Sequence, residues 1–210
     1  IFYTGAAPNQ QAIPALDYLM ENEKVQRCVL AGTDYVYPRT TNNILEAYLI
    51  SKGIAKEDIF VNYTPFGHSD WSKIVSDVVA LGADGKKVGV LSTINGDANI
   101  PLQTLKPEEL AAKYGKDAVI GDVTQAGYLG PWLWKAAVEK AKSFDVDKVV
   151  AASETGIELK TAPEGYVKLD ANHHLWSKSR IAMGMPDSTF KVVSESPELI
   201  KPDPFPKGYQ

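Results

Sequence analysis

The 210-residue sequence lacks most features that mark a specialised class of protein. Its single cysteine, Cys28, excludes a disulfide within the chain and leaves the redox compartment open. No apolar run approaches the ~18 residues that a membrane helix needs. Lys and Arg form no cluster larger than a pair such as Lys86 and Lys87, and the formal net charge is −4. Nucleic acid and anionic membrane surfaces are therefore not expected as partners.

Motifs for cofactors, metals and nucleophiles are also missing. Neither GxGxxG nor GxxxxGK[ST] occurs, so no phosphate-binding loop is predicted. His173 and His174 are adjacent, but on a strand they would point to opposite faces, and spacing places no third metal ligand. Cys28 lies in an apolar run and is interpreted as a small buried hydrophobe. We expect no cofactor, no metal site and no catalytic residue.

What is present is an ordinary globular composition, with 44% hydrophobic and 23% charged residues. Such a chain suits one large domain or two small lobes. The first residues, Ile1-Phe2-Tyr3, are predicted to belong to a strand. The sequence is therefore expected to begin within the folded domain, and any signal peptide would precede Ile1.

Up to Thr93, apolar runs alternate with helical periodicity. The predicted strands are Ile1–Gly5, Arg27–Ala31, Asp58–Thr64 and Lys87–Thr93, and the predicted helices are Gln10–Lys24, Thr40–Lys52 and Trp71–Leu81. Alternation with short connections is typical of right-handed βαβ units and a parallel sheet. The predicted fold class is α/β with a parallel Rossmann-like sheet.

The second half follows a different pattern. Helices are predicted at Lys106–Tyr114, Gln125–Ser143 and Asp145–Ala152, with Asp145 as a cap. Pro131 must kink the second of these helices or mark a later start. From Gly156 onward, Pro and Gly punctuate short runs that predict antiparallel hairpins and a last strand, FKVVSES. The C-terminal part is therefore expected to be β-rich.

The stretch VLAGTDYVYPRTTNN, residues 29–43, combines a strand, a turn and a helix start. In an open α/β sheet, ligands bind where a strand's carboxyl end feeds a helix N-terminus. Tyr35 and Tyr37 are therefore interpreted as pocket wall. A second strand-end loop, Thr93–Asp97, would open on the same edge of the sheet, which is the geometry of a pocket rim.

Seven blocks spread over most of the chain carry a family resemblance. They are YTGAAPNQQAIPALDYLM, VLAGTDYVYPRTTNNIL, YTPFGHSDWSKIV, VLSTINGDANIP, LWKAAVEKAKSFDVDKV, LDANHHL and SPELIKPDPF. Together they resemble the urea- and short-chain-amide-binding branch of type I periplasmic binding proteins, the solute receptors of ABC importers. The resemblance implies non-catalytic capture of urea or a short amide in an interlobe cleft, an ABC transporter permease as partner, and a periplasmic location.

The chain departs from that family in length. Family members have two Rossmann-like lobes, whereas this sequence starts at the first crossover strand and lacks a second piece between Ile100 and about Lys113. Residues 1–123 are expected to form the α/β lobe with the ligand loops, and residues 124–210 a helical and hairpin remainder of the other lobe. Lobes shortened in this way expose apolar faces, which favours a homo-oligomer.

An amide receptor needs acceptors for N–H groups, donors for the C=O group and flat apolar surface. The resemblance best supports the rings and hydroxyls of Tyr3, Tyr35 and Tyr37. The other polar candidates for the ligand site are Thr4, Asp34, Thr93, Asn95 and Asp97. Structural roles explain several of them equally well, because Asp34 suits a helix cap and Asn95 and Asp97 suit a turn around Gly96.

Other functions stay open at this point. An amide-sensing regulatory domain shares the fold, and an amino-acid receptor would need a charged anchor, for which only Arg39 lies near the predicted rim. A small α/β amide hydrolase would need a positioned nucleophile and base. A scaffold that has lost binding follows if the shortened lobes no longer form a pocket.

Overall fold

The computed structural model describes residues 1–95, 122–185 and 190–206. The chain divides into two compact units. The first unit comprises Ile1–Gln11 and Val119–Pro204, and the second comprises Ala12–Ala118 and Phe205–Gln210. The N-terminal residues Ile1–Gln11 thus group with the C-terminal half, unlike in the predicted division after residue 123. The assignment of residues 1–123 and 124–210 to two receptor lobes stays a prediction.

The second unit is built on a three-stranded parallel sheet in the order β2-β1-β3. The central strand β1 (Arg27–Thr33) pairs with β2 (Ile59–Thr64) on one side and with β3 (Val88–Thr93) on the other. Five of the seven residues of β1 are apolar or glycine, and all residues after Arg27 are buried, as expected for a strand covered on both faces. The predicted α/β fold class is confirmed.

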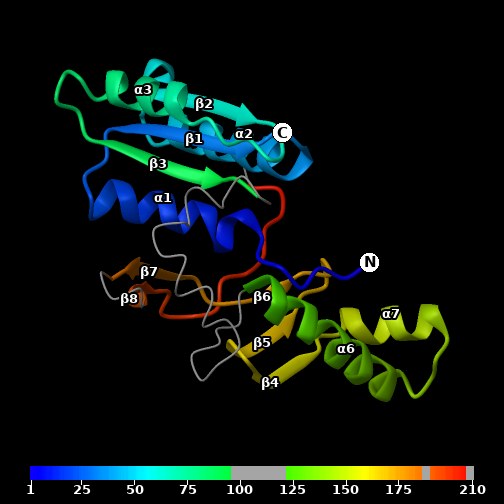
Figure 1. Ribbon diagram of the computed structural model, residues 1–210. Helices are drawn as coiled ribbons and strands as arrows, with labels where there is room; N and C mark the ends of the chain where they lie inside the picture. The colour runs from blue at the N-terminus through cyan, green and yellow to red at the C-terminus, as the bar shows by residue number, and fades with distance from the viewer. Residues whose placement is uncertain (96–121, 186–189, 207–210) are drawn as a thin grey trace. The chain divides into compact units, whose positions relative to one another are not determined.

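Helices cover both faces of this sheet (Figure 1). One face carries α1 (Ala12–Glu21) and α2 (Val36–Ser51), and the other carries α3 (Ser72–Leu81). A short 3-10 turn, Lys56–Asp58, precedes β2.

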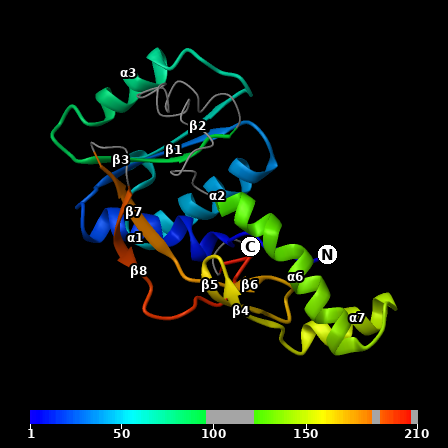
Figure 2. The same cartoon turned by 60° about the horizontal axis from the view of Figure 1, so that its bottom comes forward.

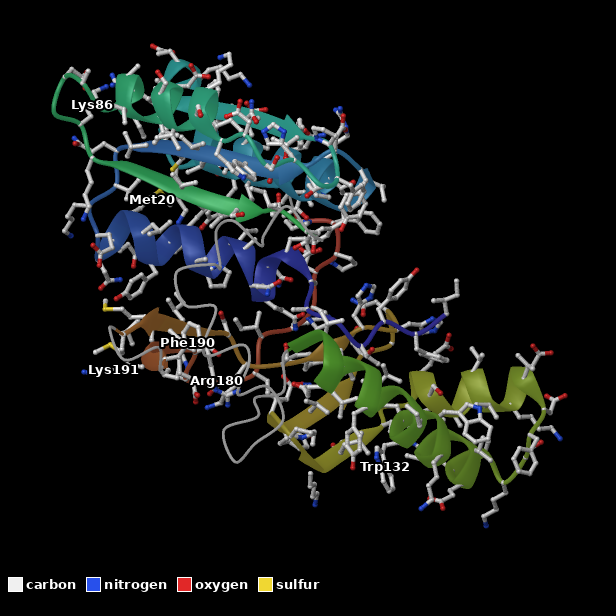
Figure 3. The ribbon with its side chains drawn as sticks, viewed as in Figure 1. Met20, Lys86, Trp132, Arg180, Phe190 and Lys191 are labelled. Atoms are coloured by element: carbon white, nitrogen blue, oxygen red, sulfur yellow. The ribbon has the colours of Figure 1, made fainter. Side chains whose placement is uncertain are left out.

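The core follows the alternation of side chains along β1. Cys28 and Leu30 pack with Leu45 and Leu49 of α2, and Met20 of α1 packs against this cluster (Figure 3). Val29, one residue along, packs instead in the cluster on the α3 face. Cys28 is only 1% exposed, which confirms its interpretation as a buried hydrophobe, and this burial raises the pKa of its thiol to about 11.

One predicted helix start and one predicted strand were wrong. Helix α2 begins at Val36 rather than Thr40, so Tyr37 and Pro38 lie in its first turn, where proline is tolerated because its missing N–H has no helical partner. Ile1–Gly5 forms no strand; only a single bridge joins Tyr3 to His174. The helix predicted at Lys106–Tyr114 lies outside the described residues.

The first unit combines two helices with antiparallel β structure (Figure 2). Its elements are a 3-10 turn Pro8–Gln10, α6 (Asp122–Ala141), α7 (Val146–Glu154), β4 (Glu158–Ala162), β5 (Gly165–Leu169), β6 (Leu175–Trp176), β7 (Arg180–Gly184) and β8 (Phe190–Glu195). β4, β5 and β6 form one sheet, and β7 pairs with β8 in a second. The predicted hairpins and β-rich C-terminal part are confirmed.

Leucines from both helices and strands form the core of this unit. Leu129 and Leu133 of α6 pack with Leu169 and Leu175 of β5 and β6. The Asp145 carboxylate accepts a hydrogen bond from the Lys148 main-chain N–H, so the predicted cap of α7 is confirmed. Within the described ranges, no helix is long and apolar enough to cross a membrane.

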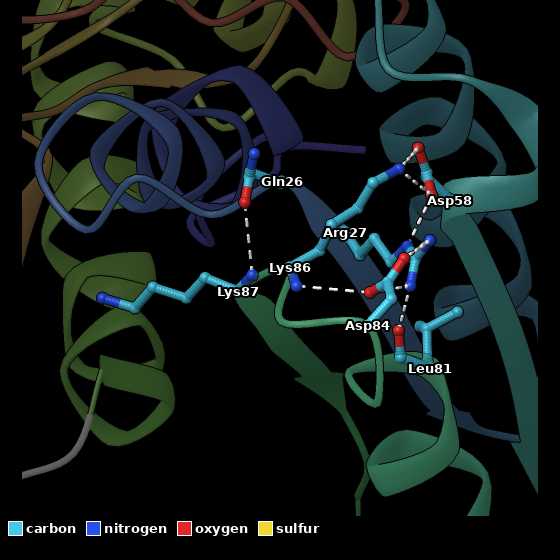
Figure 4. Close-up of polar contacts among 7 residues, drawn as sticks. All are labelled: Gln26, Arg27, Asp58, Leu81, Asp84, Lys86 and Lys87. Carbon is cyan, nitrogen blue, oxygen red and sulfur yellow. Dashed lines mark hydrogen bonds and ion pairs between the residues drawn. The ribbon is translucent and has the colours of Figure 1, made fainter.

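Ion pairs join the amino ends of the three parallel strands (Figure 4). Arg27, the first residue of β1, donates from Nε to Asp58 at 2.5 Å and from both terminal nitrogens to the Asp84 carboxylate at 2.8 Å. Lys86 Nζ lies 3.1 Å from both oxygens of Asp58. The side chains of Arg27 and Asp58 are only 16% and 14% exposed, so solvent screens this pair less than a surface pair.

This cluster predicts acid sensitivity. Hydrogen bonds from Arg27 and Lys86 hold the pKa of Asp58 below 3.8, and the Lys86 main-chain N–H with Arg27 does the same for Asp84. A carboxylate whose pKa is lowered in the folded protein stabilises the fold at any pH above its ordinary pKa. That contribution to the free energy of unfolding is lost as the pH falls through the lowered pKa. The free energy of unfolding, measured with guanidinium chloride, should therefore differ less between pH 7 and pH 3 in Arg27→Met than in wild type.

The matched control is Lys73→Met, which removes an exposed cation paired with Asp77 on the surface of α3. That variant should keep the wild-type pH dependence, because exposed pairs contribute little. An unchanged difference between the two pH values in Arg27→Met would contradict the prediction.

Candidate functional site

The carboxyl ends of the three parallel strands lie level with one another. Thr33 of β1 is opposite Thr64 of β2, and Gly32 is opposite Thr93 of β3. All three threonines end their strands and are buried. The loops that follow β1 and β3 therefore open on one edge of the sheet, as predicted.

Helix α2 packs very closely on this edge. A Cβ atom at Gly32 would lie 2.7 Å from Pro38 Cβ and 2.7 Å from Thr93 Oγ1. Asn42 of α2 is fully buried beside them, and its carboxamide oxygen accepts from the Thr93 hydroxyl at 3.1 Å. The absence of a side chain at Gly32 thus lets the first turns of α2 rest directly on the strand.

Main-chain hydrogen bonds anchor the loop between β1 and α2. The Asp34 N–H donates to the Thr64 carbonyl at 2.7 Å, and the Tyr35 N–H donates to the Thr33 carbonyl at 2.9 Å. Tyr35 is the extended N-cap residue of α2. The loop is therefore held to the ends of both β1 and β2.

An ion pair occupies the outer side of this loop. Arg39 Nε donates to the Asp34 carboxylate at 2.6 Å, and the guanidinium carbon lies 4.6 Å from the centre of the Tyr63 ring. The hydrogen bond from Arg39 lowers the pKa of Asp34. Asp34 and Arg39 thus neutralise each other at this edge.

Aromatic rings form the exposed wall of the edge. The Tyr35 ring centre lies 6.2 Å from that of Tyr37 and 5.1 Å from that of Phe66. Tyr37 is 46% exposed and Phe66 is 59% exposed. The two predicted tyrosines therefore come together with a third ring, on a surface that a flat ligand can reach.

Sequence reasoning missed Phe66. It follows β2 in the block YTPFGH, at the carboxyl end of the strand next to β1. The argument that singled out the loops after β1 and β3 applies to the loop after β2 as well. Strand order was the missing information, because the sequence does not show that β1 lies in the centre.

The loop after β3 is joined to β1 by the Thr33 side chain. The Thr33 hydroxyl accepts from the Asn95 N–H at 2.7 Å, and Asn95 Nδ2 donates to the Thr93 carbonyl at 3.1 Å. Asn95 thus shapes the turn, whereas the Thr93 hydroxyl is hydrogen-bonded within the core. Asp97 lies outside the described residues.

Tyr3 and Thr4 belong to the first unit. The Tyr3 N–H donates to the His173 carbonyl at 2.8 Å, and its ring stacks on His174 with centres 4.4 Å apart. Thr4 lines a polar cavity of that unit. The aromatic edge in the second unit is therefore built without them.

Chemically, this edge offers ring faces, phenol hydroxyls, one carboxylate and loop amides. In the ranges that the structure describes, no group of three or more His, Cys, Asp or Glu side chains could hold a metal ion. The arrangement suits recognition of a small planar molecule by stacking and hydrogen bonds.

Comparison with known proteins points to one family. The model of the periplasmic binding protein domain matches residues 1–110 and 103–210. An ABC transporter solute-binding protein from R. palustris, in complex with 4-hydroxybenzoate, has 16% identity and a TM-score of 0.67, over 94% of this chain and 67% of that chain. A second, from Rhodopseudomonas palustris HaA2 in complex with p-hydroxybenzoic acid, has 17% identity and a TM-score of 0.68, over 97% and 68%.

An amino acid ABC transporter substrate-binding protein from Pseudomonas fluorescens Pf-5 is also similar, with 16% identity and a TM-score of 0.59. It is matched over 98% of this chain and 67% of its own. The chain thus spans about two-thirds of the length of these proteins. At such identities the similarity shows the fold alone.

The close packing at Gly32 predicts a sensitive position. Gly32→Ala forces Pro38 or Thr93 to move, so it should destabilise the second unit by about 2 kcal/mol. Denaturant unfolding measures this loss. Gly127→Ala is the control, because a Cβ there meets nothing within 4 Å and lies in a helix, where alanine is favoured. Equal stabilities of the two variants would contradict the packing argument.

Proposed function

We propose a function that proceeds from one premise: this chain belongs to the periplasmic binding protein domain family. In the proposal it is a periplasmic solute receptor that binds urea or a short-chain amide and presents it to the permease of an ABC transporter. The relatives above are ABC transporter solute-binding proteins, which supports the receptor role. The amide ligand and the predicted interlobe position of the site are proposals.

The aromatic wall of Tyr35, Tyr37 and Phe66 is the observation that carries this proposal. Urea and acetamide are flat, so ring faces can cover them without a deep pocket. The loop that bears Tyr35 is held by main-chain bonds to Thr33 and Thr64, which reduces the entropy lost on binding.

The charge balance at this edge favours a neutral ligand. The Arg39 guanidinium is already paired with Asp34 and stacked over Tyr63. The pair cancels the charge of the one arginine found at this edge in the described residues, so no net positive charge attracts a ligand carboxylate. A neutral amide can instead donate its N–H groups to carboxylate or hydroxyl oxygens and leave the ion pair intact.

Within the proposal, the predicted site residues have different roles. Tyr35 and Tyr37 contact the ligand, and Asp34 and Asn95 offer polar groups beside them. Thr93 positions the loop from below, because its hydroxyl is bonded within the core. Tyr3, Thr4 and Asp97 remain candidates supported by the resemblance.

Isothermal titration calorimetry of the whole chain tests this function against urea, acetamide and formamide, with leucine for the amino-acid alternative. Wild type should bind one of the amides saturably. Tyr37→Ala removes an exposed ring and hydroxyl and should weaken that binding at least about tenfold, equivalent to ~1.4 kcal/mol. Tyr128→Ala, which removes a similarly exposed tyrosine from α6, should leave it unchanged.

Three outcomes would overturn the proposal. Binding of leucine alone would favour the amino-acid receptor. Turnover of a labelled amide would favour the hydrolase. Absence of heat with every amide, from a folded sample, would favour a scaffold without a ligand.

A further inference from the structure

The first unit contains a polar cavity of about 270 Å³. It lies between the N-terminal segment, α6, the turn after β4 and the segment that joins β6 to β7. Its wall consists of Thr4, Gly5, Ala6, Gln10, Gln11, Gln125, Glu164, Leu175, Ser177, Lys178, Ser179 and Arg180. The wall contains no aromatic residue among those described, in contrast to the edge of the parallel sheet.

Two serine residues of this wall have hydroxyl groups without a hydrogen-bond partner in the described part of the chain. Ser177 and Ser179 are only 8% and 7% exposed, and among the described residues neither hydroxyl makes a hydrogen bond. Gln10 differs, because its carboxamide accepts from Ala7 N–H and donates to two carbonyls. The Ser177 and Ser179 hydroxyls line the cavity and therefore have hydrogen-bonding capacity for a ligand.

Two cations are held in place at the same wall. Lys178 Nζ lies 2.6 Å from one carboxylate oxygen of Glu195, and Arg180 Nε lies 2.5 Å from the other. Glu195 does not line the cavity. Arg180 also donates from Nη2 to the Glu164 carbonyl at 3.3 Å. Glu195 thus orients the two side chains from outside the cavity. The Lys178 ammonium and the Arg180 guanidinium retain further N–H donors.

The charged residues in the wall are Lys178, Arg180 and Glu164, and Glu195 behind the wall brings the local sum to zero. A ligand carboxylate would be held by hydrogen bonds, because its two oxygens match the planar N–H edge of a guanidinium. The serine hydroxyls can donate to the same oxygens. We propose that this cavity is a second binding site, for a small monocarboxylate, separate from the aromatic wall of Tyr35, Tyr37 and Phe66.

Acetate and acetamide are nearly isosteric and differ in charge, so they test the proposal directly. The whole ¹⁵N-labelled chain is titrated with each at pH 7 and constant ionic strength, with chloride as balancing salt. Acetate should shift the amide signals of Ser177 to Arg180 saturably. Arg180→Gln should weaken acetate binding about tenfold, as expected for loss of a charge-assisted hydrogen bond, and Ser179→Ala should weaken it as well.

The control is Lys191→Gln, which removes an exposed cation from β8, away from the Arg180 end of the same hairpin (Figure 3). It should bind acetate like wild type. Unchanged melting temperatures show that Arg180→Gln and Ser179→Ala are folded. If either variant does not fold, the test rests on whether acetate saturably shifts the amide signals of Ser177 to Arg180 in the wild type.

Several outcomes would overturn the second site. They are the absence of saturable shifts with acetate, equal shifts with chloride, and undiminished acetate binding in both folded variants. The amide site is judged separately, because Tyr37→Ala should leave acetate binding intact. Loss of acetamide binding without loss of acetate binding would refute the proposed function alone.

Discussion

The close approach of α2 to β1 is the constraint on which the architecture of the second unit depends. Only a residue without a side chain fits at Gly32, between Pro38, Asn42 and Thr93. That contact fixes where α2 starts, and the start of α2 determines where Tyr35 and Tyr37 lie. A change in core packing would therefore move the aromatic wall as well as lower stability.

The two ends of the same sheet carry different chemistry. At the amino end, Arg27 joins the segments before β2 and β3 through Asp58 and Asp84, with little exposure of the Arg27 and Asp58 side chains. At the carboxyl end, buried threonines and main-chain bonds hold the loops, and the exposed surface is aromatic. The ion pairs at the amino end contribute to stability, and the aromatic carboxyl end is where we propose that a neutral molecule is bound.

Much of the fold was predictable because local and long-range signals agreed. The apolar runs of β1, β2 and β3 can be recognised from the sequence, and parallel pairing then places the loops after β1 and β3 on one edge. The start of α2 was not predictable, since Tyr37 and Pro38 read as a loop. Their helical conformation depends on packing against Gly32, which is a tertiary contact.

The cavity of the first unit was harder to foresee for a different reason. Lys178 and Arg180 read as ordinary charges on a hairpin, and no local spacing connects them with Thr4 or Gln125. Only the antiparallel register, which places Arg180 opposite Glu195, orients both cations on one carboxylate. From the sequence, Arg39 was therefore the one charged anchor that could be identified, because it lies near the predicted rim.

The two arginines show why position decides function more than residue type does. Arg39 is paired through Nε with Asp34 beside the aromatic wall, where its side chain is exposed. Arg180 is held by Glu195 from outside its cavity, and its remaining N–H groups can bind a ligand without breaking that pair. Each acidic partner bonds Nε of its arginine, but Arg180 lines a cavity, whereas the Arg39 side chain lies at an exposed edge. We therefore propose a neutral ligand beside Arg39 and a carboxylate beside Arg180.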